Sequence, residues 1–147
     1  QRLHTITFSQ VAAYYLKRLA ELKQDTARKV VFRKEVFLQN LEGILAEISR
    51  LKQDRVLPDF DPGLLDRNYL ADKADRFLKY CLKKRYLEKM RIEDRKEALM
   101  LDIERILSSY PVKEFRKANP LAFCANELSS LGEQIFRPIF DERLGTR

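Results

Sequence analysis

The chain has 147 residues, the size of one ordinary domain, and its 45% hydrophobic content is enough to build a core. Lys and Arg outnumber Asp and Glu by 29 to 22, so the formal net charge is +7 and the sequence pI is near 9.5, which favours anionic partners. Only four glycines and five prolines occur, a composition typical of helical proteins.

Cysteine usage argues against a secreted disulfide scaffold. Cys81 and Cys124 are far apart and form no CxxC motif, which favours a reducing setting, so we predict a cytoplasmic protein. No apolar run approaches the ~20 residues of a membrane helix, and we expect no membrane partner. We expect one domain over residues 1–147. Because the chain starts with Gln1 instead of Met, we expect that this domain can be the C-terminal part of a larger protein.

Two helices are predicted in the first third of the chain. Residues 1–8 form a lead-in, and Ser9 caps a helix whose apolar positions are Ala12, Tyr15, Leu16, Leu19 and Leu22. A second apolar series does not continue this phase, so we expect a break at residues 24–26, with Asp25 or Thr26 capping the second helix. That series consists of Val31, Leu38, Leu41, Leu45 and Ile48.

Residues 54–66 contain the clearest turn signals. Pro58, Pro62 and Gly63 disfavour helix, and neighbouring Asp residues favour turns. We interpret this acidic stretch as a loop packed on the core and not as a domain linker. The side chains expected to hold it there are Leu57, Phe60, Leu64 and Leu65.

Residues 69–109 are predicted to be one helix of roughly 40 residues, or two helices broken near residues 86–92. Asp66 or Asn68 can cap the start. The absence of Gly and Pro favours the continuous helix. Its apolar stripe would consist of Leu70, Ala74, Phe77, Leu78, Cys81, Ile92, Leu99, Ile103, Ile106 and Tyr110.

A last helix is predicted to start at Asn119-Pro120, a cap residue followed by proline in the first turn, and to end or kink at Pro138. Its apolar face would consist of Leu121, Cys124, Ala125, Leu128, Leu131 and Ile135. No segment shows a convincing strand pattern. We therefore predict an all-α helical bundle of about five helices, including one or two long ones.

The densest positive charge lies in residues 76–96, where nine Lys or Arg and three acidic residues leave +6 of the total +7. On a helix, Arg76, Lys79 and Lys83 fall opposite the apolar stripe, and Lys84 lies nearer its edge. Amines with this spacing can contact successive phosphates without reading bases. The alternatives are a solvated helix face and a surface for an acidic protein.

A second cluster consists of Arg28, Lys29, Arg33 and Lys34. At the start of the second helix these cations would oppose the helix dipole, which favours a role in phosphate binding. A third, weaker group precedes the last helix and consists of Lys113, Arg116 and Lys117.

Most aromatic residues lie on or beside the apolar stripes and are expected in the core. Tyr86 and Phe32 lie among basic residues away from the main stripe, so they are the candidates for stacking on exposed bases.

Catalytic signals are weak. His4 is the single histidine and lies near a terminus, and no GxxxxGK[ST], GxGxxG, HExxH or GxSxG pattern occurs. The acidic pairs Glu93-Asp94 and Asp141-Glu142 lie among cations and are interpreted as ion-pairing surface. We predict that the protein is not an enzyme and takes no cofactor, metal or small-molecule substrate.

Size, charge and helix layout resemble those of the small subunits of type I CRISPR effector (Cascade-like) complexes. The stretches that carry the resemblance are residues 11–25, 103–111 and 120–128. The resemblance implies a non-catalytic bundle, present in more than one copy, that lies beside the guide–target duplex and holds the displaced strand in antiviral defence. The family has no motif that transfers residue by residue, so the candidate binding residues come from charge alone.

The predicted function is therefore a non-catalytic subunit that binds the backbone of RNA or DNA without sequence specificity, together with other protein subunits of a larger assembly. The alternative is a helical protein–protein adaptor whose basic face contacts an acidic partner. An exposed apolar patch at Leu82, Leu87 and Met90 would favour the adaptor. Binding to anionic membranes is a third possibility, which predicts liposome binding that depends on anionic lipid.

Overall fold

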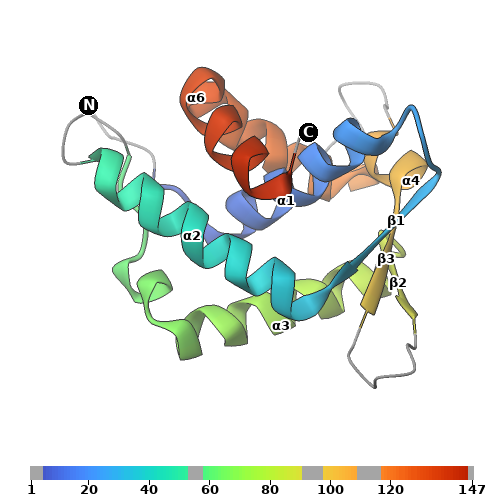
Figure 1. Ribbon diagram of the computed structural model, residues 1–147, viewed down its shortest axis with the longest axis horizontal. Helices are drawn as coiled ribbons and strands as arrows, with labels where there is room; N and C mark the ends of the chain where they lie inside the picture. Colours follow the sequence, from blue (N-terminus) through green and yellow to red (C-terminus); the bar gives the residue numbers. More distant parts are fainter. Residues whose placement is uncertain (1–4, 53–57, 91–97, 109–116, 146–147) are drawn as a thin grey trace.

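The computed structural model describes residues 5–52, 58–90, 98–108 and 117–145. This part of the chain is mostly helical, as predicted, but it also contains a three-stranded antiparallel sheet, so the prediction of a purely α-helical bundle is wrong (Figure 1). The elements follow the order α1 (Phe8–Lys23), β1 (Lys29–Arg33), α2 (Lys34–Lys52), the 3₁₀-helix η1 (Pro62–Leu65), α3 (Arg67–Lys83), β2 (Leu87–Met90), β3 (Ala98–Asp102), α4 (Ile103–Leu107) and α6 (Pro120–Leu144).

The helices pack around α1, and the sheet lies at one end of them (Figure 1). The most extensive helix pair is α1 with α6, while α2 contacts both α6 and α3. One continuous cluster of buried apolar side chains includes residues from the four longest helices and from the sheet. This core fixes the relative positions of the surfaces described below.

Helix α1 begins two residues earlier than predicted. Thr7, and not Ser9, is the cap: its hydroxyl accepts from the Gln10 N–H at 3.2 Å, and the Gln10 side chain accepts from the Thr7 N–H at 3.1 Å. This reciprocal pair is a capping box. The predicted apolar positions Ala12, Tyr15, Leu16 and Leu19 are buried, whereas Leu22 is half-buried.

The second helix does not start at Asp25 or Thr26, because residues 29–33 form strand β1. β-branched and aromatic side chains at positions 30–32 suit a strand that pairs with another. Helix α2 follows directly from Lys34, and its predicted core residues Leu41, Leu45 and Ile48 are buried. Val31 is 48% exposed and does not belong to a helix stripe.

The loop before α3 packs on the core, as predicted. Phe60 is buried and forms a β-bridge with Ile6, and Leu64 is also buried. Leu65 is exposed, contrary to prediction, and Leu57 lies outside the described residues. Asp66 caps α3 by accepting from the Asn68 N–H at 3.2 Å, which confirms one of the two predicted caps.

The continuous helix predicted over residues 69–109 is wrong, because α3 ends at Lys83. Arg85 adopts a left-handed backbone (φ 65°) and donates to the Leu82 carbonyl at 3.2 Å, while Tyr86 donates to the Cys81 carbonyl at 2.9 Å. This pair of bonds is a Schellman motif, which ends helices. The alternative of two helices broken near residues 86–92 is also wrong, since β2 and β3 follow.

The sheet has the strand order β1-β3-β2. Because Val30 pairs with Leu101 and Leu101 with Leu87, these three side chains share the face turned toward the core. The opposite face carries Val31 beside Met100, and Met90 on the next strand is 43% exposed. Leu87 was predicted to lie off the helix stripe but is a core residue. Strand β2 has four residues, which is too short a pattern to distinguish strand periodicity from helix periodicity.

Helix α6 starts as predicted. Asn119 caps it by accepting from the Ala122 N–H at 3.2 Å, and Pro120 occupies the first turn. Pro138 does not end the helix, which reaches Leu144; the backbone leaves helical geometry at Gly132 instead. The predicted apolar face is buried at Leu121, Ala125 and Leu128 and half-buried at Cys124, Leu131 and Ile135.

Candidate nucleic-acid interface

Three predicted binding residues form a ridge on α3. Arg76, Lys79 and Lys83 are exposed, while Ala74 and Cys81 of the same helix are buried. Side chains three and four positions apart on a helix have Cβ atoms about 5–6 Å apart. Arg76 pairs with Asp72 at 3.2 Å, but its side chain remains 73% exposed. We call Arg76, Lys79 and Lys83 the cationic ridge.

Lys84 lies just beyond the helix, in the turn that contains Arg85. Its amine is 6.0 Å from the centre of the Tyr80 ring. It therefore extends the positive surface past the end of α3, although it does not continue the helical spacing of the ridge.

The second predicted cluster is divided by strand β1. Arg28 precedes the strand and Lys29 begins it, whereas Arg33 ends it and Lys34 begins α2. Four steps along a strand span about 13 Å, so the two halves of the cluster lie apart. Only Lys34 lies in the first helical turn, and the expectation that all four cations oppose the helix dipole is wrong.

The two halves also have different surroundings. Lys29 forms an ion pair with Glu88 of β2 at 3.4 Å, and both side chains are exposed. Lys34 lies 2.5 Å from Asp75 of α3, an ion pair outside hydrogen-bond geometry. Through Asp75, the start of α2 is joined to the helix that carries the cationic ridge.

A basic hollow of about 280 Å³ lies where α2, α3 and the sheet meet. Three lysines from three different elements line it, namely Lys34, Lys79 and Lys89, together with the single carboxylate of Asp75. The lining charges therefore sum to three minus one, or +2. The remaining lining is apolar and consists of Leu78, Leu82 and Leu99.

Sequence reasoning assigned Lys34 and Lys79 to separate clusters and left Lys89 out of the binding residues. Lys89 pairs with Leu99 in the sheet, on the face that turns toward the hollow. Its position depends on strand alternation, and a helical interpretation of residues 76–96 could not reveal it.

Neither aromatic candidate for base stacking is suitably placed. Tyr86 is buried, its hydroxyl donates to Asn119 Oδ1 at 2.9 Å, and the Arg105 guanidinium lies 5.2 Å from its ring centre. Phe32 is half-buried, with its ring 5.8 Å from that of Phe37. The aromatic side chain that reaches solvent beside the ridge is Tyr80, which is 38% exposed.

The third predicted cluster is only partly described. Lys117 is exposed, while Lys113 and Arg116 lie outside the described residues, as do His4 and the pair Glu93-Asp94. The carboxylate of Asp141 accepts from Arg18 at 2.7 and 3.0 Å, so it serves the contact between α1 and α6.

The described residues hold no cluster of metal-ligating groups: in these ranges, no set of three or more His, Cys, Asp or Glu side chains is arranged to hold a metal ion. Cys81 is buried, and burial raises the pKa of its thiol, so it stays protonated at neutral pH.

No protein-family model, curated protein or solved structure matches this chain. The resemblance to small subunits of type I CRISPR effector complexes therefore stays a prediction. Within the same described ranges, no helix has both the length and the apolar character needed to cross a membrane.

Proposed function

We propose that this protein binds the sugar–phosphate backbone of nucleic acid without sequence specificity, as a non-catalytic subunit of a larger ribonucleoprotein or DNA-associated assembly. The observation that carries the proposal is the basic hollow, where Lys34, Lys79 and Lys89 gather from three elements. Lys79 belongs both to the hollow and to the cationic ridge, so the two form one surface.

The chemistry of this surface suits phosphates better than bases. Lysine amines are flexible point charges, and each phosphate they neutralise releases condensed counterions. The side chains in the hollow other than the charged ones are leucines, which offer no hydrogen bonds to base edges. Binding of this kind depends steeply on salt and little on sequence.

The test is binding of unrelated single-stranded and duplex oligonucleotides across a salt series. We expect the double variant Lys79→Glu/Lys83→Glu to weaken binding to all of them by more than about tenfold at low salt. The slope of log affinity against log salt should fall by about one unit for each lysine that contacts a phosphate.

The matched control compares Lys79→Gln/Lys83→Gln with Lys23→Gln/Arg137→Gln, because each double variant removes two positive charges at exposed positions. Glutamine is used at position 137 because a new carboxylate there would face Glu133 and Asp141. The affinity of the Lys23→Gln/Arg137→Gln variant should stay close to that of the unchanged protein. Equal losses in both variants, or a flat response to salt, would contradict a localised phosphate-binding surface.

The outer face of the sheet supports a second candidate, the protein–protein adaptor. The predicted patch of Leu82, Leu87 and Met90 does not exist as such, because Leu87 is buried. Instead Val31 and Met90 are exposed on the outer face of the sheet, beside the Lys29–Glu88 ion pair. In the same salt series, this function predicts no oligonucleotide binding even at low salt.

A further inference from the structure

A second hollow lies on the other side of α3, between the starts of α1 and α6. It measures about 350 Å³, near the lower end of the ~300–1,000 Å³ found for small-molecule pockets. Phe8, Phe77 and Tyr80 contribute aromatic rings to its lining, and Leu121 and Cys124 come from α6. We call it the aromatic hollow.

The aromatic walls are fixed by packing. The Phe8 and Phe77 rings meet edge to face, with centres 5.9 Å apart and an interplanar angle of 81°. Phe8 is buried and Phe77 is half-buried, whereas Tyr80 remains 38% exposed. A rigid aromatic lining beside a partly exposed ring is suited to a flat, unsaturated guest.

Two cations flank these rings on α3. Four residues of this helix line the aromatic hollow, namely Lys73, Arg76, Phe77 and Tyr80. The last three follow Lys73 by three, four and seven positions, so all four lie on one side of the helix. The Arg76–Asp72 pair is solvent-exposed on both sides, so a phosphate can replace the carboxylate at little cost. A guest with a planar ring and an attached anion satisfies both parts of this site.

Arg76 also belongs to the cationic ridge, so the aromatic hollow opens beside the surface proposed to hold phosphates. We propose that the aromatic hollow takes one unstacked nucleobase from a strand whose phosphates lie along the ridge. This inference rests on the function proposed above and narrows its ligand to single-stranded nucleic acid.

The preference for single strands follows from access to the base. In a duplex each base is paired and stacked, and it must leave the helix before a pocket can take it. In a single strand the bases are already available, and an aromatic wall accepts any of them because every base has a flat π-face. The site therefore adds a preference for strandedness without adding one for sequence.

The experiment compares two single-stranded oligonucleotides of equal length and charge, oligo(dT) and an abasic backbone of the same phosphate number. We expect the unchanged protein to bind oligo(dT) about tenfold more tightly. Tyr80→Leu, which keeps an apolar side chain but removes the ring, should abolish most of this difference, and Tyr80→Phe should keep it. Circular dichroism melting confirms that both variants are folded.

The outcomes separate the inference from the function on which it rests. Equal affinity of the unchanged protein for oligo(dT) and for the abasic strand, with normal salt dependence, overturns the base site and leaves backbone binding intact. No salt-dependent binding of either strand overturns both. Lys79→Glu/Lys83→Glu should weaken both ligands by the same factor, which distinguishes phosphate contacts from base contacts.

Photo-crosslinking provides a measurement that needs no variant. An oligonucleotide containing 5-iodouridine should crosslink to α3 at Phe77 or Tyr80, as located by mass spectrometry. Crosslinks confined to other elements would overturn the assignment. Retention of a bound hydrophobic dye in the aromatic hollow after saturation with oligo(dT) would assign the hollow to an apolar ligand, which also overturns it.

Discussion

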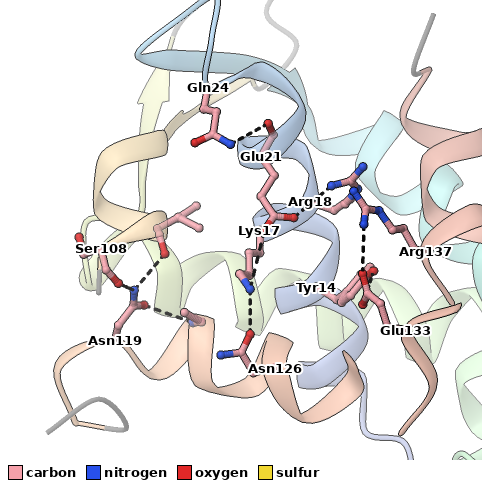
Figure 2. A network of polar contacts seen from close by, with 12 residues as sticks. Tyr14, Lys17, Arg18, Glu21, Gln24, Ser108, Asn119, Asn126, Glu133 and Arg137 are labelled. Carbon is pink, nitrogen blue, oxygen red and sulfur yellow. Dashed lines mark hydrogen bonds and ion pairs between the residues drawn. The ribbon is translucent and has the colours of Figure 1, made fainter. Parts of the chain in front are cut away.

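At the scale of single residues, Asn119 joins more parts of the fold than its place in the sequence indicates. It is 1% exposed and caps α6 through Oδ1, which also accepts from the Tyr86 hydroxyl at 2.9 Å. Its amide donates to the carbonyls of Ile106 and Ser108 at 2.9 and 3.0 Å (Figure 2). Only an amide offers an acceptor and two donors at once, so the cap and the network require Asn and not merely any cap residue.

We expect Asn119→Ala to lower the free energy of unfolding by about 3–5 kcal/mol. Loss of the cap costs about 1 kcal/mol. A buried group left without a hydrogen-bond partner costs about 1–3 kcal/mol, and the groups that Asn119 now satisfies supply the rest of the loss. Urea unfolding measures the change. The milder variant Tyr86→Phe should cost about 1 kcal/mol, because Asn119 keeps its other bonds; equal losses in the two variants would contradict the central place of Asn119.

At the scale of elements, the end of α3 determines where the basic segment changes from helix to sheet. The Schellman motif requires a left-handed residue, and glycine is the usual choice. Arg85 occupies that position with φ 65°, which costs an L-residue about 1–2 kcal/mol. The backbone N–H of Tyr86 completes the motif, and the Tyr86 side chain is buried in the core, so tertiary packing holds the strained turn in place.

Arg85→Gly should therefore raise the free energy of unfolding by up to about 1 kcal/mol. Glycine relieves the left-handed strain, but its greater chain entropy in the unfolded state offsets part of this gain. Arg85→Ala is the matched control, since it removes the same charge but keeps Cβ. Chemical unfolding of both variants checks the prediction, which fails if glycine and alanine have the same effect.

At the scale of the whole molecule, polar contacts between α1 and α6 join the two ends of the described chain. Tyr14 donates to Glu133 at 2.9 Å and Lys17 donates to Asn126 at 2.8 Å, as Figure 2 shows. Arg18 makes two further bonds to Asp141. These contacts flank the apolar interface and select the register in which the two helices pack.

Tyr14 makes this interface sensitive to alkaline pH. Burial, followed by the hydrogen bond to Glu133, raises its pKa above the ordinary value of 10.0. The unfolded chain loses the phenolic proton near that value while the folded chain keeps it, so this stabilising contribution is present below pH 10.0 and is lost as the pH rises above it. At one pH unit above 10.0, the free energy of unfolding is lower by about 1.4 kcal/mol.

Tyr14→Phe tests this linkage. At pH 8 the variant should be less stable than the unchanged protein by about 1.5 kcal/mol, the value of a hydrogen bond to a charged group. Near pH 11 the gap should almost close, because phenylalanine has no proton to lose. Urea unfolding at both pH values measures the two gaps, and a gap independent of pH would sink the assignment.

Much of the helical layout could be predicted because its signals are local. The caps Asp66 and Asn119 and the buried stripes of α1, α2 and α6 depend on residues one to four positions apart, which a sequence pattern records directly. The charge of residues 76–96 could also be recognised, but the secondary structure that carries this charge could not. A cationic ridge on α3 followed by a strand has the same composition as one long helix.

By itself, then, the sequence determined the starts of α3 and α6, which follow from their cap residues. It also determined most of the apolar faces and the ridge of Arg76, Lys79 and Lys83, which follow from helical spacing. Only the tertiary structure decided that residues 29–33 pair with residues 98–102, that Lys34 and Lys89 join Lys79 around one hollow, and that Tyr80 borders another. The reason is physical. Strand pairing and pocket walls depend on contacts between segments far apart in the chain, and four or five residues of a strand leave too short a pattern to reveal their partners.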